Sequence, residues 1–84
     1  MEDLSSSVIL ENIRQIRHER RYSQEYMAIS LTVSQNAYSK LERGRTKLTW
    51  DRLAEIANIL ETSMEELLKD AGRDSRRPRA DNYA

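Results

Sequence analysis

One stretch, residues 24–43 with the sequence QEYMAISLTVSQNAYSKLER, limits what this chain can fold into more than any other. Ser23 and Ser34 each precede a short segment of mixed apolar and polar residues. A serine in that position can accept a hydrogen bond from an unpaired amide in the first turn of a helix. We therefore predict helices over residues 24–31 and 35–43. Since only residues 32–34 separate them, the two helices must meet through a tight turn.

The second of these helices has two different faces. At about 100° per residue, Ala37, Tyr38 and Leu41 fall within one arc. The opposite arc has no acid and carries Gln35, Asn36, Ser39, Lys40 and Arg43. Amides and lysines are side chains that read base edges in DNA. We expect base contacts from Gln35, Asn36 and Lys40, and Ser39 is a further candidate.

These features resemble the lambda-repressor/Cro (Xre-type) helix-turn-helix family, and the similarity extends from about Leu10 to Leu68. The matching residues are Ile13, Ile16, Arg17, Gln24, Met27, Ala28, Leu31, Val33, Tyr38, Leu41 and Glu42-Arg43-Gly44, followed by LTWDRLAEIANILETSMEELL. The resemblance implies an all-α fold: a compact five-helix, lambda-repressor-like DNA-binding domain with the helix-turn-helix at its second and third helices.

One residue of the turn departs from that family. Thr32 stands where the family usually has glycine. If Thr32 has a positive φ, its β-branched side chain costs roughly 1 kcal/mol or more. Otherwise the turn is built differently.

The resemblance also implies contacts for particular side chains. Arg17 and Glu42 match a pair that forms a salt bridge between the first helix and the recognition helix, although two solvated charges are the alternative. Gln24 matches a residue that meets a DNA phosphate, for which a first-turn glutamine without such a role is the alternative. The basic loop after the recognition helix matches one that holds the sugar-phosphate backbone. The expected backbone contacts are Gln24, Ser34, Arg43, Arg45 and Lys47.

Three further helices are expected around this pair. Ile9, Ile13 and Ile16 predict one over residues 8–20, with the single histidine on its surface. Gly44 is a natural left-handed stop for the recognition helix. Thr49 is expected to cap a fourth helix, whose first turn holds Trp50, interpreted mainly as a cover for the core edge. Ser63 and Glu66 form a capping box for a last helix ending near residue 71.

The domain organisation follows from the same pattern. We expect a flexible lead-in over residues 1–7, the helix-turn-helix domain over 8–71 and a flexible basic tail over 72–84. Net charge is zero, but residues 14–47 hold eight Lys or Arg against three Glu, whereas residues 51–71 are acidic. Such a polarised domain is suited to steering one face toward phosphates.

The chain lacks the residues and motifs that several classes of function require. The chain has no cysteine, one histidine and no glycine-rich phosphate loop, so we expect no enzyme activity, no metal site and no cofactor. No long apolar run indicates a membrane span or a secretion signal, and a cytoplasmic location is the default.

The leading hypothesis is a sequence-specific, double-stranded DNA-binding transcriptional regulator, of repressor or controller type. One recognition helix reads only a few base pairs, so we expect a homodimer on an inverted-repeat operator. Its surface must come from the last two helices, with five candidates: Met64, Leu67, Leu68, Trp50 and Leu60. The alternative is that these residues close the core of the monomer.

Two other readings remain open. A short helix-turn-helix chain also resembles the antitoxin half of a toxin-antitoxin pair, which would need a surface for a toxin. An adaptor would use the same fold to bind protein. It would not need the set of Gln35, Asn36 and Lys40.

Overall fold

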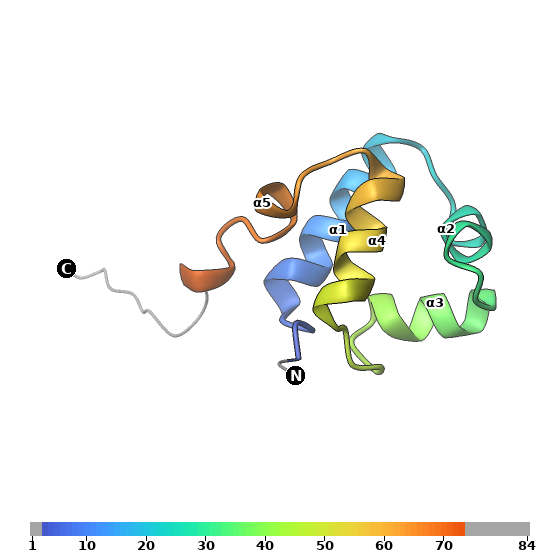
Figure 1. The fold of residues 1–84 in the computed structure, drawn as a ribbon, viewed down its shortest axis with the longest axis horizontal. Coiled ribbons are helices and arrows are strands. Elements are labelled where there is room, and N and C mark those ends of the chain that lie inside the picture. The colour runs from blue at the N-terminus through green and yellow to red at the C-terminus, as the bar shows by residue number, and fades with distance from the viewer. Residues whose placement is uncertain (1–2, 74–84) are drawn as a thin grey trace.

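In the computed structural model, the described part of the chain, residues 3–73, is built from helices without strands. The elements are α1 (Ser7–Glu19), α2 (Gln24–Leu31), α3 (Gln35–Glu42), α4 (Trp50–Leu60), α5 (Met64–Leu67) and a short 3₁₀ turn, η1 (Ala71–Arg73). Figure 1 shows α1 and α4 together at the centre, α2 and α3 beyond α4, and α5 on the other side of α1. The predicted all-α, five-helix fold is confirmed.

Each α-helix begins at a hydroxyl side chain that accepts a hydrogen bond from a backbone N–H of the first turn. The five caps are Ser6, Ser23, Ser34, Thr49 and Ser63. Four amide groups at the start of an α-helix have no partner within it, and each cap satisfies one of them. These caps fix where the helices start, which is why the sequence located the starts closely.

The turn between α2 and α3 keeps a left-handed residue despite lacking glycine. Thr32 has φ 63° and ψ 44°, and its N–H lies near the carbonyls of Ala28 and Ile29. Val33 N donates to Ala28 O at 2.9 Å, which closes the turn. Thr32 therefore takes the conformation that costs a β-branched side chain most.

Replacing Thr32 with glycine is expected to raise the free energy of unfolding by about 0.5 to 1 kcal/mol. Glycine adopts a positive φ without strain, which stabilises the folded state. This gain is larger than the loss that comes from the greater conformational entropy of the unfolded chain. Thr62 is the matched control, since it follows a helix but is absent from the residues of positive φ. Thr62→Gly is expected to destabilise the protein in the same urea titration. A loss of stability in Thr32→Gly would contradict the strain assignment.

The core forms where α1, α2, α3 and α4 converge, and Ile13, Met27, Leu53 and Ile56 are fully buried in it. Ala28, at 2% exposure, is small enough to let α2 approach its neighbours closely. Trp50 is 49% exposed, so it does not serve mainly as a cover for the core.

Two of the residues expected at a dimer surface are wrong for that role. Leu60 and Leu67 are both 0% exposed because they close the core of the monomer. Met64 and Leu68 are half-buried against the same core, and Trp50 is exposed. Of the five candidates, only these three can present apolar surface to another chain while the monomer core stays intact.

The last helix is shorter than predicted. α5 ends at Leu67 instead of continuing to about residue 71, and Asp70 has φ 65°, which an α-helix cannot include. The side-chain amide of Asn12 in α1 donates to the carbonyls of Leu67 and Lys69, at 2.9 Å each. These tertiary bonds satisfy carbonyls that a longer helix would have bonded internally.

The lead-in also differs from the flexible segment that was expected. Leu4 N donates to Leu48 O at 2.8 Å. Ser5 Oγ accepts from Leu48 N at 3.0 Å and donates to Thr46 O at 3.3 Å. Asp3 Oδ1 accepts from Leu48 N at 3.3 Å. Residues 3–5 thus hold the loop that follows α3.

The predicted basic tail lies outside the described residues, apart from its first two positions. Within residues 3–73, no helix is long and apolar enough to cross a membrane.

Candidate nucleic-acid interface

The exposed face of α3 carries the residues expected to contact bases. Gln35, Asn36 and Lys40 are exposed, whereas Ser39 is half-buried and has less reach. Tyr38 and Leu41 point the other way, into the core. Within residues 3–73 these four polar side chains make no hydrogen bond to protein, so their donors and acceptors remain for a ligand.

The residues expected to contact the DNA backbone come from three segments next to that face. Gln24 lies in the first turn of α2, Ser34 caps α3, and three cationic side chains follow in the exposed segment after α3: Arg43, Arg45 and Lys47. Ser34 Oγ accepts from Ala37 N at 3.0 Å, which leaves its hydroxyl hydrogen for an acceptor. Gly44, at φ 78°, redirects the chain into this segment.

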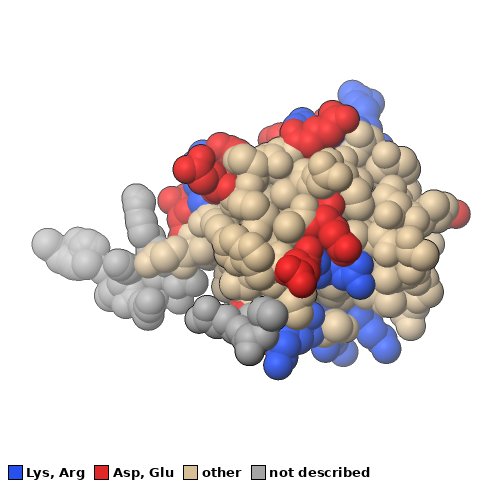
Figure 2. Space-filling view, in the orientation of Figure 1, with Lys and Arg blue, Asp and Glu red and all other residues tan. Residues whose placement is uncertain are grey.

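Charge is distributed unevenly over the surface of the domain. Figure 2 shows Lys and Arg side chains gathered along the lower edge, where α3 and its following loop lie in Figure 1. Asp and Glu side chains lie over α4 and, mixed with further Lys and Arg side chains, along the upper edge. On this view cationic side chains predominate along the α3 side, which favours approach of a polyanion from that side.

A buried ion pair holds α3 against α1. Arg17 Nε donates to Glu42 Oε2 at 2.7 Å, and Arg17 Nη2 donates to Glu42 Oε1 at 3.1 Å. Arg17 is 8% exposed and Glu42 is 1% exposed. This two-pronged geometry suits a carboxylate and fixes the orientation of the recognition helix.

Two further donors complete this network, and sequence reasoning missed both of them. Tyr38 Oη donates to Glu42 Oε2 at 2.7 Å, and Gln24 Nε2 donates to Glu42 Oε1 at 2.9 Å. The spacing of Tyr38 and Glu42, four residues apart on one helix, was a usable signal. A carboxamide nitrogen carries two hydrogens, so Gln24 keeps one for a phosphate while Glu42 orients it.

Arg14 adds a second tie between α1 and α3. Its Nη1 donates to the backbone carbonyl of Glu42 at 2.8 Å, and its Nη2 donates to Glu11 Oε1 at 2.8 Å. Arg14 therefore satisfies a carbonyl at the end of α3, where a cation is also favoured by the helix dipole.

The hydrogen bonds and the burial of this network shift the pKa values of Glu42 and Tyr38. Burial by itself would raise the pKa of Glu42. The hydrogen bonds from Arg17, Tyr38 and Gln24, with the positive charge of Arg17, outweigh burial and lower that pKa below its ordinary value of 4.5. Burial and the neighbouring Glu42 carboxylate raise the pKa of Tyr38. Glu42 is thus held as the anion and Tyr38 as the neutral donor.

The free energy of unfolding is expected to fall as the pH drops below about 4.5. A carboxyl group whose pKa is lower when folded contributes stability above its unfolded pKa, and that stability is lost as pH falls through the folded value. Urea titrations from about pH 3 to about pH 7, a range that includes the titration of carboxyl groups, measure the effect. Glu42→Gln should show a shallower decline than the parent chain. An equal decline in both would assign the pH dependence to other carboxyls.

The lead-in places an acid close to this basic segment. The pKa of Asp3 is lowered, first by its hydrogen bond with Ser5 and further by its bond to Leu48 N and the nearby Lys47. The hydrogen bonds of residues 3–5 thus stabilise the conformation of the loop that carries Lys47.

No group of three or more His, Cys, Asp or Glu within residues 3–73 is arranged to hold a metal ion. The chemistry that this surface offers is hydrogen bonding and positive charge, supplied by a rigid helix and its flanking segments.

Comparisons with known proteins bear on the family and the fold. A family model described as a helix-turn-helix domain matches residues 11–69. An uncharacterized HTH-type transcriptional regulator, YqaE of Bacillus subtilis (strain 168), is 34% identical over 59 residues. That match covers 70% of this chain and 51% of the relative, so the chain spans about half the length of that curated protein.

A solved structure shares the fold. The crystal structure of the clp gene regulator ClgR from C. glutamicum superposes with a TM-score of 0.76 at 26% sequence identity. The match covers 90% of this chain and 100% of that one.

Proposed function

Since this chain belongs to the helix-turn-helix domain family, we propose that it is a sequence-specific regulator of transcription that binds double-stranded DNA. The observation that carries the proposal is the acid-free, exposed polar face of α3, held by a buried ion pair next to a basic loop. The protein acts as a regulator and not as an enzyme, in keeping with the regulators it is similar to. We propose that it works in the cytoplasm, the compartment that holds the DNA.

In the proposed complex, α3 enters the major groove. Gln35, Asn36 and Lys40 read base edges, with Ser39 as a shorter additional contact. The first turn of α2, the cap of α3 and the loop that follows α3 bind phosphates, through Gln24, Ser34, Arg43, Arg45 and Lys47. Phosphate contacts set register and supply much of the affinity, whereas base contacts set the sequence preference.

Lys47→Ala is expected to weaken binding to all DNA sequences alike and to reduce the slope of log affinity against log salt by about 1. Lys47 is exposed on the loop that residues 3–5 hold, so its loss leaves the fold intact. Fluorescence anisotropy with duplexes of different sequence, at several salt concentrations, measures both quantities and tests whether this face binds DNA. Lys69→Ala, an exposed lysine beyond α5, is the control and should change neither quantity. An altered base preference in Lys47→Ala would contradict its assignment to phosphate.

We further propose that the chain binds an inverted repeat as a homodimer, with repression as the outcome. Half-sites would lie about 34 Å apart, one turn of the duplex. Because Leu60 and Leu67 are buried in the core, the apolar part of the proposed dimer surface comes from Trp50, Met64 and Leu68. Sedimentation should show a dimer on DNA. A monomer at high micromolar concentration, both with and without DNA, would overturn the dimer.

A further inference from the structure

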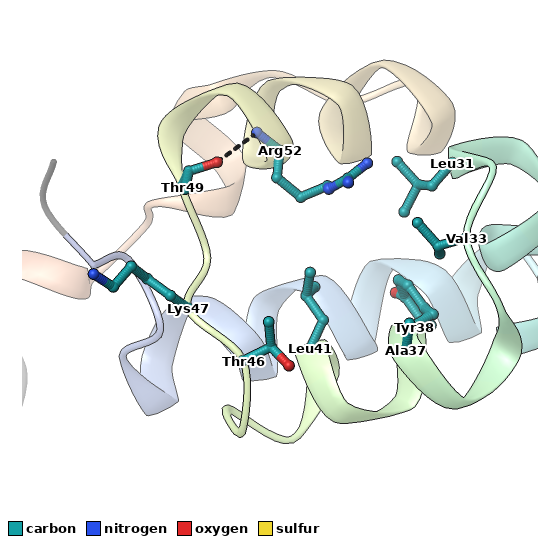
Figure 3. Close-up of a pocket in the computed structure, with 9 residues that line it drawn as sticks. All are labelled: Leu31, Val33, Ala37, Tyr38, Leu41, Thr46, Lys47, Thr49 and Arg52. Atoms are coloured by element: carbon teal, nitrogen blue, oxygen red, sulfur yellow. Dashed lines mark hydrogen bonds between the residues drawn. The ribbon is translucent and has the colours of Figure 1, made fainter.

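A pocket of about 250 Å³ lies between α3 and α4, on the side of α3 away from the side chains assigned to base contact. Five apolar or aromatic side chains line it: Leu31, Val33, Ala37, Tyr38 and Leu41. Figure 3 shows Arg52 extending from α4 across the pocket toward Leu31 and Val33, whereas the Lys47 side chain points away from these residues.

The two charged side chains that line the pocket are both cationic. Arg52 and Lys47 line it, and no Asp or Glu does. Arg52 Nη1 donates to Glu55 Oε1 at 2.8 Å, and within residues 3–73 the other guanidinium nitrogens of Arg52 have no hydrogen-bond partner. The pocket therefore combines an apolar wall with a guanidinium that can donate to an anion.

The size of the pocket limits the ligand. An apolar cavity of about 150 Å³ accommodates benzene, so 250 Å³ leaves room for one six-membered ring and a small polar group. A carboxylate suits a guanidinium in charge and geometry. We propose that this pocket binds a small carboxylate whose apolar body is about the size of one ring.

Occupancy of the pocket also acts on the proposed DNA interface, a step that rests on the proposed function. The ligand contacts Ala37 and Leu41 of the recognition helix and brings a negative charge to the Arg52 guanidinium near Val33, next to Ser34, which is assigned to a DNA phosphate. Repulsion of the DNA phosphates then lowers affinity for DNA. Benzoate, as the probe, is therefore expected to weaken DNA binding.

The test is a titration of the ¹⁵N-labelled whole chain with benzoate at constant ionic strength, followed by amide chemical shifts, with benzyl alcohol as the uncharged probe. Benzoate should give saturating shifts at Val33, Ala37 and Thr46 and bind at least about threefold more tightly than benzyl alcohol. Arg52→Gln should abolish that preference, whereas Arg52→Lys and the distant Lys69→Gln should keep it. Glu55→Gln should strengthen benzoate binding because it releases Nη1 of Arg52.

Shifts that do not saturate, equal affinities for the two probes, or an unchanged preference in Arg52→Gln would overturn the pocket assignment. In a parallel anisotropy titration, saturating benzoate should weaken DNA binding of the parent chain but not of Arg52→Gln. Unchanged DNA affinity under saturating benzoate would overturn the regulatory step alone. A chain that binds no DNA without benzoate would count against the proposed function and not against the pocket.

Discussion

Replacing Glu42 with alanine is expected to lower the free energy of unfolding by about 3 to 5 kcal/mol. The substitution leaves the Arg17 guanidinium buried without its counter-charge and removes the acceptor of Tyr38 Oη and Gln24 Nε2. A buried charge or hydroxyl without a partner keeps its desolvation cost and gains nothing in return. Urea denaturation at neutral pH measures the loss. Glu55→Ala is the control, because Glu55 is exposed, Arg52 is only half-buried, and such a pair is worth about 1 kcal/mol or less.

The pairing itself is tested by a double-mutant cycle with Arg17→Met. Each single substitution leaves the other charge buried, so the double variant should lose clearly less stability than the sum of the two singles. Additive losses would mean that Arg17 and Glu42 act independently. That outcome would remove the ion pair as the element that orients α3.

Gln35→Ala is expected to remove about 1 to 3 kcal/mol of discrimination at one base pair of the DNA site. Gln35 is the first residue of α3, is exposed and makes no hydrogen bond within residues 3–73. Its carboxamide is available for a two-bond contact with adenine. Affinities for the preferred duplex and for its single-base variants, measured at one salt concentration, locate the affected position.

The matched control for that experiment is Gln15→Ala, which changes an exposed glutamine on α1. It should leave both affinity and base preference unchanged. If Gln35→Ala weakened binding to every sequence equally, Gln35 would be a backbone contact and not a base contact.

The sequence predicted the helix starts and the polar face of α3 because both depend on local rules. A serine or threonine that accepts from the first turn acts within four residues of chain, and Ser23, Ser34, Thr49 and Ser63 all do so. The faces of α3 follow from helical geometry alone, and Tyr38 and Leu41 are buried as that geometry requires.

Features that depend on contacts between distant residues were harder to predict. The end of α5 is set by Asn12, 55 residues from Leu67 in the sequence. The segment 3–5 is ordered by Leu48, and spacing along the chain gives no sign of that bond. For Leu60 and Leu67 the sequence left both a dimer surface and a monomer core possible, since both demand the same residue types, and the structure places them in the core.

Selection from a random pool of DNA duplexes at physiological salt tests the proposed regulator most directly, because the enriched sequence reports function and symmetry together. An inverted repeat with half-site centres about 10 base pairs apart is the predicted result, since a two-fold dimer places its recognition helices one turn apart. Recovery of DNA without enrichment would contradict sequence-specific regulation. No recovery at all would contradict DNA binding by this face and favour a protein-binding adaptor.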